Sequence, residues 1–152
     1  MKTHWTEVVV GSQLRYNGPD GVVIFRVTEE LPSSEEHSRR IKAVNMDNDS
    51  TIYLELDTGS GYVFQIRTVD PASIPYTAEQ LMLMTEGGRA NVVVTFEGVV
   101  FETQNTEDEP DQWVRWYLRS AQMTHITMTV ENFVIKAEWH RNFPDDAFTV
   151  VQ

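Results

Sequence analysis

The sequence predicts a mainly β protein of the α+β class, in which an antiparallel meander forms a curved sheet or a partly closed barrel with two short helices. Short runs rich in β-branched and aromatic residues recur along the chain, and clusters of glycine, asparagine and aspartate separate them. Short strands joined by tight turns are typical of small antiparallel sheets and barrels. With 152 residues, 41% of them hydrophobic, the chain can bury one core, so we expect residues 1–152 to form a single domain.

The densest β-forming segment covers residues 90–104, where valine and phenylalanine predominate. Glu97-Gly98 interrupts this run, and glycine adopts a positive φ at little steric cost. The segment is therefore either a tight hairpin or one long strand with a bulge.

Residues 51–57 show the clearest strand pattern, because aliphatic and polar side chains alternate along them. Similar runs, bounded by turn-forming residues, predict strands over the first half of the chain. These expected strands are residues 5–10, 14–16, 22–27, 41–46, 51–57 and 62–69.

Two polar stretches separate these strands in different ways. Residues 17–21 contain asparagine, proline, aspartate and two glycines, which predicts a turn and hence a hairpin between the flanking strands. Residues 28–40 are charged and contain one proline, so we expect an exposed loop with a short helical turn from Ser33 or Ser34.

A first helix is expected at residues 78–85. Thr77 and Gln80 have the spacing of a capping box, in which each side chain bonds to the backbone N–H of the other residue. Gly87-Gly88 provides the signal that ends the helix.

A second helix is expected at residues 110–121. Thr106 and Glu109 repeat the capping-box spacing, and proline is tolerated in a first turn. Trp113 and Trp116 recur at helical spacing, so both are expected on one face.

The chain is expected to finish in a hairpin. Residues 124–130 and 133–140 have strand character on either side of a turn at Glu131-Asn132. Residues 143–151 add an edge strand.

Composition excludes several function classes. Lys and Arg total 12 against 23 Asp and Glu, a net charge of −11, so we expect neither a nucleic-acid backbone nor an anionic membrane as the direct partner. The absence of cysteine excludes disulfides and thiolate chemistry and fits a reducing compartment. No apolar run has the length of a membrane span or the character of a signal peptide, so we expect a cytoplasmic protein.

Two His-x-Thr triplets provide a catalytic alternative. His4 with Thr6, and His125 with Thr127, have the period-2 spacing that places both side chains on one face of a strand. These triplets resemble the signature of the 2H phosphoesterase family. The resemblance covers six residues and implies that each histidine acts as an acid or base while each threonine hydroxyl holds phosphate oxygens.

The last hairpin also carries residue types that bind metals. Glu138 and His140 have the same spacing as His125 and Thr127, and with His4 they would supply three imidazoles and a carboxylate. Exposed strand faces carry such residues routinely, so no metal site is expected. The chain also lacks a phosphate-binding glycine loop and the Gly-x-Ser-x-Gly and His-Glu-x-x-His motifs, so we expect no cofactor and a binding protein in preference to an enzyme.

Two acidic loops are the most informative feature. Aspartate and glutamate near a helix N-terminus favour the helix dipole, but both loops hold more acids than capping requires. Together with a nearby aromatic residue they can dock on a basic surface through electrostatic steering and an aromatic anchor. The expected partner-binding residues are Glu29, Glu30, Glu35, Glu36, Glu107, Asp108, Glu109, Asp111 and Trp113.

The function expected from the sequence is therefore binding and inhibition of a basic protein. In class only, and independently of fold, the chain resembles toxin-immunity proteins and phage inhibitors, whose targets are basic nucleases and other nucleic-acid-handling enzymes. One alternative is a small phosphodiesterase or ligand-binding β-barrel that uses His4 and His125. Another is a structural component of a larger assembly, although no heptad or symmetric patch supports it. The oligomeric state is open.

Overall fold

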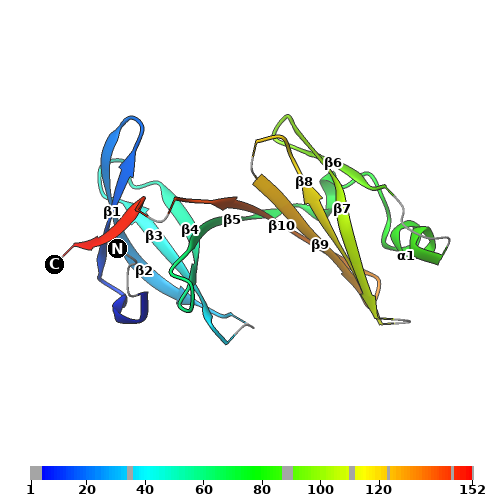
Figure 1. Ribbon diagram of the computed structural model, residues 1–152, viewed down its shortest axis with the longest axis horizontal. Coiled ribbons are helices and arrows are strands. Elements are labelled where there is room, and N and C mark those ends of the chain that lie inside the picture. The colour runs from blue at the N-terminus through cyan, green and yellow to red at the C-terminus, as the bar shows by residue number, and fades with distance from the viewer. Residues whose placement is uncertain are drawn as a thin grey trace. The chain divides into compact units, whose positions relative to one another are not determined.

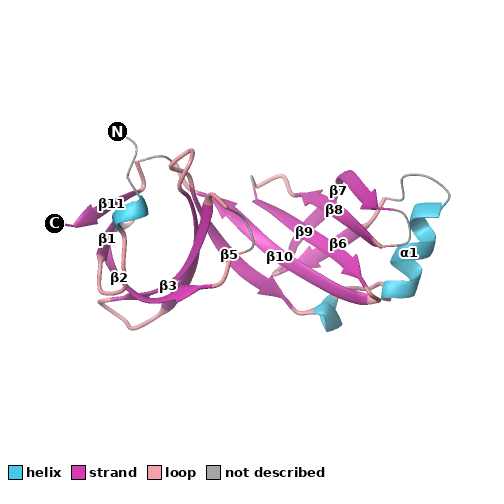
Figure 2. Cartoon of the chain, turned by 90° about the horizontal axis from the view of Figure 1, so that it is seen from below, coloured by secondary structure: helices cyan, strands magenta, loops and turns pink. Residues whose placement is uncertain are grey.

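The computed structural model describes residues 5–33, 36–86, 91–109, 112–122, 124–144 and 146–151. Over these residues the chain forms eleven strands, one α-helix and two 3-10 turns (Figures 1 and 2). The strands follow the order β11-β1-β2-β3-β4-β5-β10-β9-β8-β7-β6 in one antiparallel sheet that is not closed. The predicted mainly β, antiparallel fold class is therefore confirmed.

The bounds of the elements show how little of the described chain is irregular. The elements are η1 (Trp5–Glu7), β1 (Gln13–Gly18), β2 (Gly21–Leu31), β3 (Ser38–Asn45), β4 (Thr51–Asp57), β5 (Val63–Val69), η2 (Pro71–Ser73), α1 (Ala78–Glu86), β6 (Val93–Phe96), β7 (Val99–Glu109), β8 (Trp113–Arg119), β9 (Thr124–Glu131), β10 (Val134–Asn142) and β11 (Phe148–Val151). None of the helices among the described residues is long and apolar enough to cross a membrane.

The chain divides into two compact units. Unit 1 comprises Met1–Ile66 and Asn142–Gln152, and unit 2 comprises Arg67–Arg141. Each unit has its own cluster of buried apolar side chains.

Unit 1 is built from β1 to β4, the start of β5, and β11. The predicted hairpin is present, since β1 and β2 pair from Gln13↔Arg26 to Gly18↔Gly21, and β11 pairs with the other edge of β1. Figure 2 shows β1 to β3 curving together. An aromatic group closes the core, in which the rings of Tyr16 and Phe148 stack with centroids 5.0 Å apart.

Two sequence predictions for unit 1 are wrong. Residues 5–10 do not form a strand, because Trp5 is buried and its indole Nε1 donates to the carbonyl oxygen of Gly61 at 2.9 Å, which anchors a 3-10 turn. Residues 28–40 are not one long loop. Strand β2 continues to Leu31 past a bulge between Val27 and Glu29, and β3 begins at Ser38.

Unit 2 contains β6 to β9, most of β10, and α1. The densest β segment forms the β6–β7 hairpin, with Phe96 opposite Val99 and Glu97-Gly98 as a two-residue turn. The predicted first helix is also confirmed as α1. Its capping box is complete, since the backbone N–H of Thr77 donates to Gln80 Oε1 at 2.9 Å and that of Gln80 donates to Thr77 Oγ1 at 3.1 Å.

The second predicted helix is wrong, because residues 113–119 form strand β8. Every second side chain of β8 is buried, namely Val114, Trp116 and Leu118, and this is the period of a strand. The apparent capping box belongs to strand β7, which pairs with β8 as far as Glu109↔Trp113. The sequence of this segment is thus compatible with both a helix and a strand. Its pairing with β7 and β9 makes it a strand.

The predicted last hairpin is confirmed as β9 and β10, with a turn shifted by one residue. Glu131 pairs with Val134, so Asn132 and Phe133 form the turn. The edge strand expected in residues 143–151 is β11.

Candidate functional site

One end of the unit 2 sheet carries a row of acidic and apolar side chains on the face opposite the core. Cross-strand pairing aligns Glu109 with Trp113, Trp113 with Glu131, and Glu131 with Val134. Directly opposite residues of an antiparallel pair share a face. We call these four residues the acidic row. It crosses β7, β8, β9 and β10, which Figure 1 shows as neighbouring strands.

Arg115 connects the acidic row to the next row of the same face. Its guanidinium carbon lies 5.4 Å from the centroid of the Trp113 ring, and its NH1 lies 3.8 Å from Glu107 Oε2. The hydroxyl of Tyr117 donates to the same Glu107 oxygen at 3.2 Å. These contacts orient Glu107 and Trp113 on one side of the sheet and leave Glu109 and Glu131 at its end.

The second predicted acidic loop, the one that precedes Trp113 in the sequence, is therefore part of the sheet surface. Glu107, Asp108 and Glu109 are exposed at the end of β7, and Trp113 is half-buried at the start of β8. They belong to paired strands and not to a loop beside a helix, which corrects the sequence interpretation. Asp108 lies opposite Val114 and so points to the core-side face, whereas Asp111 lies outside the described residues.

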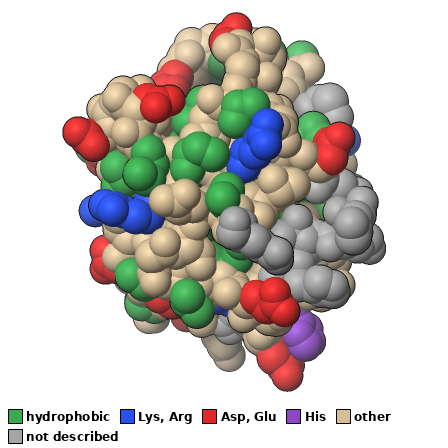
Figure 3. Space-filling model, turned by 90° about the vertical axis from the view of Figure 1, so that its left-hand side faces the viewer, with side chains coloured by type: hydrophobic (Ala, Val, Ile, Leu, Met, Phe, Trp, Pro, Cys, Tyr) green, Lys and Arg blue, Asp and Glu red, His purple; other side chains and the backbone are tan. Residues whose placement is uncertain are grey.

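The first predicted acidic group belongs to unit 1 and is partly neutralised. Glu29 and Glu30 lie on strand β2, not in a loop. Arg39 binds both carboxylate oxygens of Glu30, at 2.8 and 2.9 Å, and Lys42 lies opposite Glu29. On the side that Figure 3 shows, acidic side chains are spaced singly around the edge of the view.

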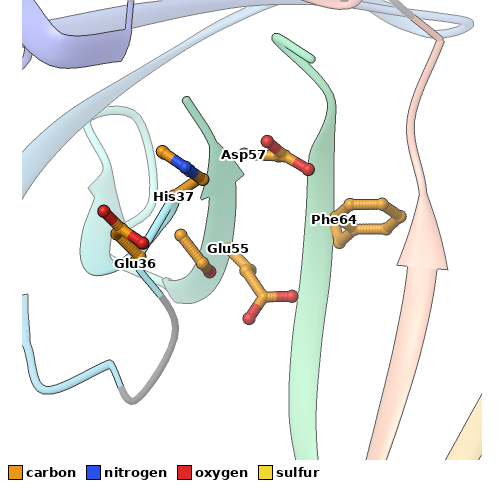
Figure 4. A pocket seen from close by; sticks show the side chains of 6 residues that line it. Glu36, His37, Glu55, Asp57 and Phe64 are labelled. Carbon is orange, nitrogen blue, oxygen red and sulfur yellow. The ribbon is translucent and has the colours of Figure 1, made fainter. Parts of the chain in front are cut away.

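Glu36 borders a pocket in unit 1, while Glu35 lies outside the described residues. The pocket has a volume of about 300 Å³, and Figure 4 shows acidic side chains and an imidazole around it. Glu55 is held at 3.2 Å by NH2 of Arg40. The residues that line it are Glu36, His37, Ser38, Glu55, Asp57 and Phe64.

Asp57 stabilises the turn beside this pocket. Its carboxylate accepts the backbone N–H groups of Ser60 at 3.0 Å and Gly59 at 2.9 Å. These bonds, that of Ser60 foremost, hold the pKa of Asp57 below its ordinary value of 3.8, and His37 adds a smaller effect in the same direction. The ionised carboxylate is therefore favoured in the folded state.

Replacing Asp57 by alanine is expected to lower the free energy of unfolding by about 1 kcal/mol at neutral pH, because two backbone donors lose their acceptor. The pH dependence has a definite sign. The contribution is complete above the unfolded pKa, and it is lost as the pH falls through 3.8 towards the lower folded value. Urea unfolding at a series of pH values measures both effects. Asp57→Asn, which keeps an acceptor oxygen but does not titrate, should lose this part of the acid sensitivity; an unchanged pH profile would contradict the assignment.

Of the two His-x-Thr triplets, only the second lies wholly within the described residues. His4 of the first triplet lies outside the described residues, and Trp5 and Thr6 belong to the 3-10 turn of unit 1 and not to a strand. His125 and Thr127 lie on β9 of unit 2 and share a face, as their spacing predicts.

His125 and His140 are opposite each other on β9 and β10, as the sequence suggested. Their rings stack with centroids 4.6 Å apart and an angle of 7° between the ring planes, and Nε2 of His140 lies 3.4 Å from Glu138 Oε1. The nitrogens of two stacked rings point along parallel planes, so they do not converge on one metal ion. Within the part of the chain that the structure describes, no three His, Asp or Glu side chains are grouped to hold a metal ion.

Comparison with protein families, with characterised proteins and with solved structures finds no match to this chain.

The sequence analysis did not identify two residues at this end of the unit 2 sheet as candidates for partner binding. Glu131 and Phe133 are far in sequence from Glu109 and Trp113, and only the register of three strand pairs places them at one end of the sheet. The signal that could have found them is the two-residue spacing between Glu131 and Val134, which is typical of a tight hairpin.

Proposed function

We propose that the protein binds and inhibits a basic protein partner through the acidic row and its neighbour Glu107, which lies on the same face of the sheet. The observation that carries the proposal is the alignment of Glu109 and Glu131 on either side of the half-buried Trp113. An aromatic centre with charged surroundings is the usual composition of a protein interface with strong electrostatic steering. The net charge of −11 favours a cationic partner over long range.

Unit 2 supports this role better than unit 1. The carboxylate of Glu30 is engaged by Arg39 within the same unit. In the acidic row, neither Glu109 nor Glu131 has a cationic residue directly opposite, since both are paired with Trp113. Basic nucleic-acid-handling enzymes are one class of partner with the required charge.

Affinity capture tests the proposal. The immobilised protein is exposed to native lysate at low salt and eluted with a salt step, and eluted proteins are identified by mass spectrometry. We expect the salt step to release a basic protein. The activity of this released partner should fall when the purified acidic protein is added to it. A variant carrying Glu107→Lys and Glu109→Lys, both on the face of the acidic row, should fail to retain it.

The matched control reverses charge in the first acidic group, by Glu29→Lys and Glu36→Lys in unit 1. This variant should retain the partner about as well as the wild type. Equal retention by the unit 2 variant, or capture that is indifferent to salt, would contradict the electrostatic account.

A second candidate function is a small-ligand or phosphodiesterase site at His125. A hollow of about 430 Å³ on unit 2 is lined by this residue together with Arg119 and Asn105, which suit an anion, and with the carboxylate of Glu107, which does not. A screen of nucleotides and cyclic phosphates tests it. Binding or turnover that His125→Ala abolishes without loss of fold would support this function, and activity retained by both His125→Ala and His4→Ala would remove it.

A further inference from the structure

The β9–β10 turn holds an aromatic side chain in a costly backbone conformation. Asn132 and Phe133 are its two central residues, with φ of 52° and 61°. A turn with positive φ at both positions matches the twist of a hairpin, and it favours asparagine at the first position and glycine at the second. A bulky residue at positive φ is a steric outlier because its Cβ crowds the backbone.

The same chain contains a matched turn that lacks this strain at its second central position. The β6–β7 hairpin has Glu97 and Gly98 at its two central positions, with φ of 51° and 79°. Glycine therefore occupies the second position where the turn only has to reverse the chain. At Phe133 the equivalent position carries a phenyl ring instead.

Burial in unit 2 does not compensate for this strain. Phe133 is 76% exposed, the highest value among the large hydrophobic side chains that the structure describes as exposed. Backbone strain that no stabilising contact within the fold offsets is typical of binding sites. An exposed aromatic ring on a short turn is well suited to enter a cavity on another molecule.

The surroundings of Phe133 indicate what it meets. Val134, 52% exposed, extends the apolar surface along β10, and Glu131 lies directly opposite Val134. Glu131 in turn lies opposite Trp113 of the acidic row. Lys136 is the nearest cation along β10 on this face, and it lies opposite the neutral Thr129.

We propose that Phe133 is the aromatic anchor of the interface, and that it enters an apolar pocket bordered by Lys or Arg side chains on a basic protein partner. The cationic border pairs with Glu131 and Glu109, while Phe133 and Val134 fill the pocket. Charge complementarity selects a basic protein and opposes a second copy of this acidic chain. This inference rests on the proposed function, and it names Phe133 as the main contact residue of that interface.

Phe133→Gly separates binding from folding, because the two effects have opposite signs. Glycine relieves the turn, so the variant should unfold at a higher denaturant concentration than the wild type. Loss of the anchor should weaken retention of the captured basic protein about 30-fold or more. Phe133→Asn, which also tolerates positive φ, should show the same loss of binding and guards against an unexpected folding defect in the glycine variant.

Leu83→Ala is the matched control. Leu83 is 57% exposed on α1 of the same unit, outside the acidic row, so its removal should leave retention unchanged. Binding by Phe133→Gly and Phe133→Asn at the wild-type level would overturn the anchor while leaving the proposed function intact. Failure of the wild type to capture any basic protein would overturn both.

Photo-cross-linking identifies what touches the turn. A benzophenone amino acid at position 133, and separately at position 83, is activated in native lysate at low salt. The proposal expects position 133 to cross-link to a basic protein, with salt suppressing the product, and position 83 to give no such product. No cross-link from position 133, a cross-link to a second copy of this chain, or one to an acidic protein would each contradict it.

Discussion

Replacing Trp116 by alanine lowers the free energy of unfolding of unit 2 by about 3–5 kcal/mol. Trp116 is fully buried in the centre of the unit 2 core, where β8 lies between β7 and β9. Its indole Nε1 finds no acceptor among the described residues, so Trp116→Phe should cost much less than the alanine variant. Chemical denaturation followed by far-ultraviolet circular dichroism measures both changes.

Trp113→Ala is the control, because its effect on stability distinguishes a strand from a helix in this segment. In strand β8, Trp113 and Trp116 lie an odd number of residues apart and face opposite sides, so losing the half-buried Trp113 should cost about 1 kcal/mol or less. On a helix both would share one face. Similar losses from the two alanine variants would contradict the strand assignment.

Replacing Trp5 by alanine is expected to destabilise unit 1 by a comparable amount, about 3–5 kcal/mol. Trp5 is 1% exposed, and it closes the core through its Nε1 bond to Gly61. Its own carbonyl oxygen accepts from NH1 of Arg39 at 2.5 Å, which ties the 3-10 turn to β3.

Hydrogen exchange measures this second change locally. In the Trp5→Ala protein, amides of β1 to β4 should lose protection most strongly. Thr6→Ala, which changes the exposed neighbour of Trp5, should leave the same amides protected. Equal loss of protection in both variants would show that Trp5 does not anchor the core.

Runs rich in β-branched and aromatic residues, bounded by turn-forming residues, were sufficient to predict most strands, and period-2 alternation gave the clearest case. Residues 51–57 were predicted as a strand with those bounds, and Leu54 and Leu56 are fully buried as the pattern requires. Thr77 and Gln80 were sufficient to predict α1, because a capping box is a local interaction. Features that depend on neighbours in sequence were therefore readable in advance.

Residues 113–119 show why other features were not readable. Trp113 and Trp116 have helical spacing, while Val114, Trp116 and Leu118 have strand spacing, so the local sequence supports both structures. Pairing of β8 with β7 and β9 decides between them, and that pairing is a long-range property. Trp5 was likewise assigned to a strand because its partner, Gly61, is distant in sequence.

The candidate site was only half predictable for the same reason. Acid content pointed to Glu107, Asp108 and Glu109, and aromatic content pointed to Trp113. The addition of Glu131 and its turn required the register of β8, β9 and β10. Composition also grouped the acids of residues 28–40 with those of residues 102–111, whereas the structure assigns them to different units.

The slope of log affinity against log salt concentration, measured by calorimetry for the purified complex with the captured partner, tests the central claim most directly. The account predicts that affinity falls steeply with salt, and that Glu109→Gln and Glu131→Gln each reduce the slope as well as the affinity. An affinity that is independent of salt, or slopes unchanged by both substitutions, would contradict the acidic row as the partner-binding surface.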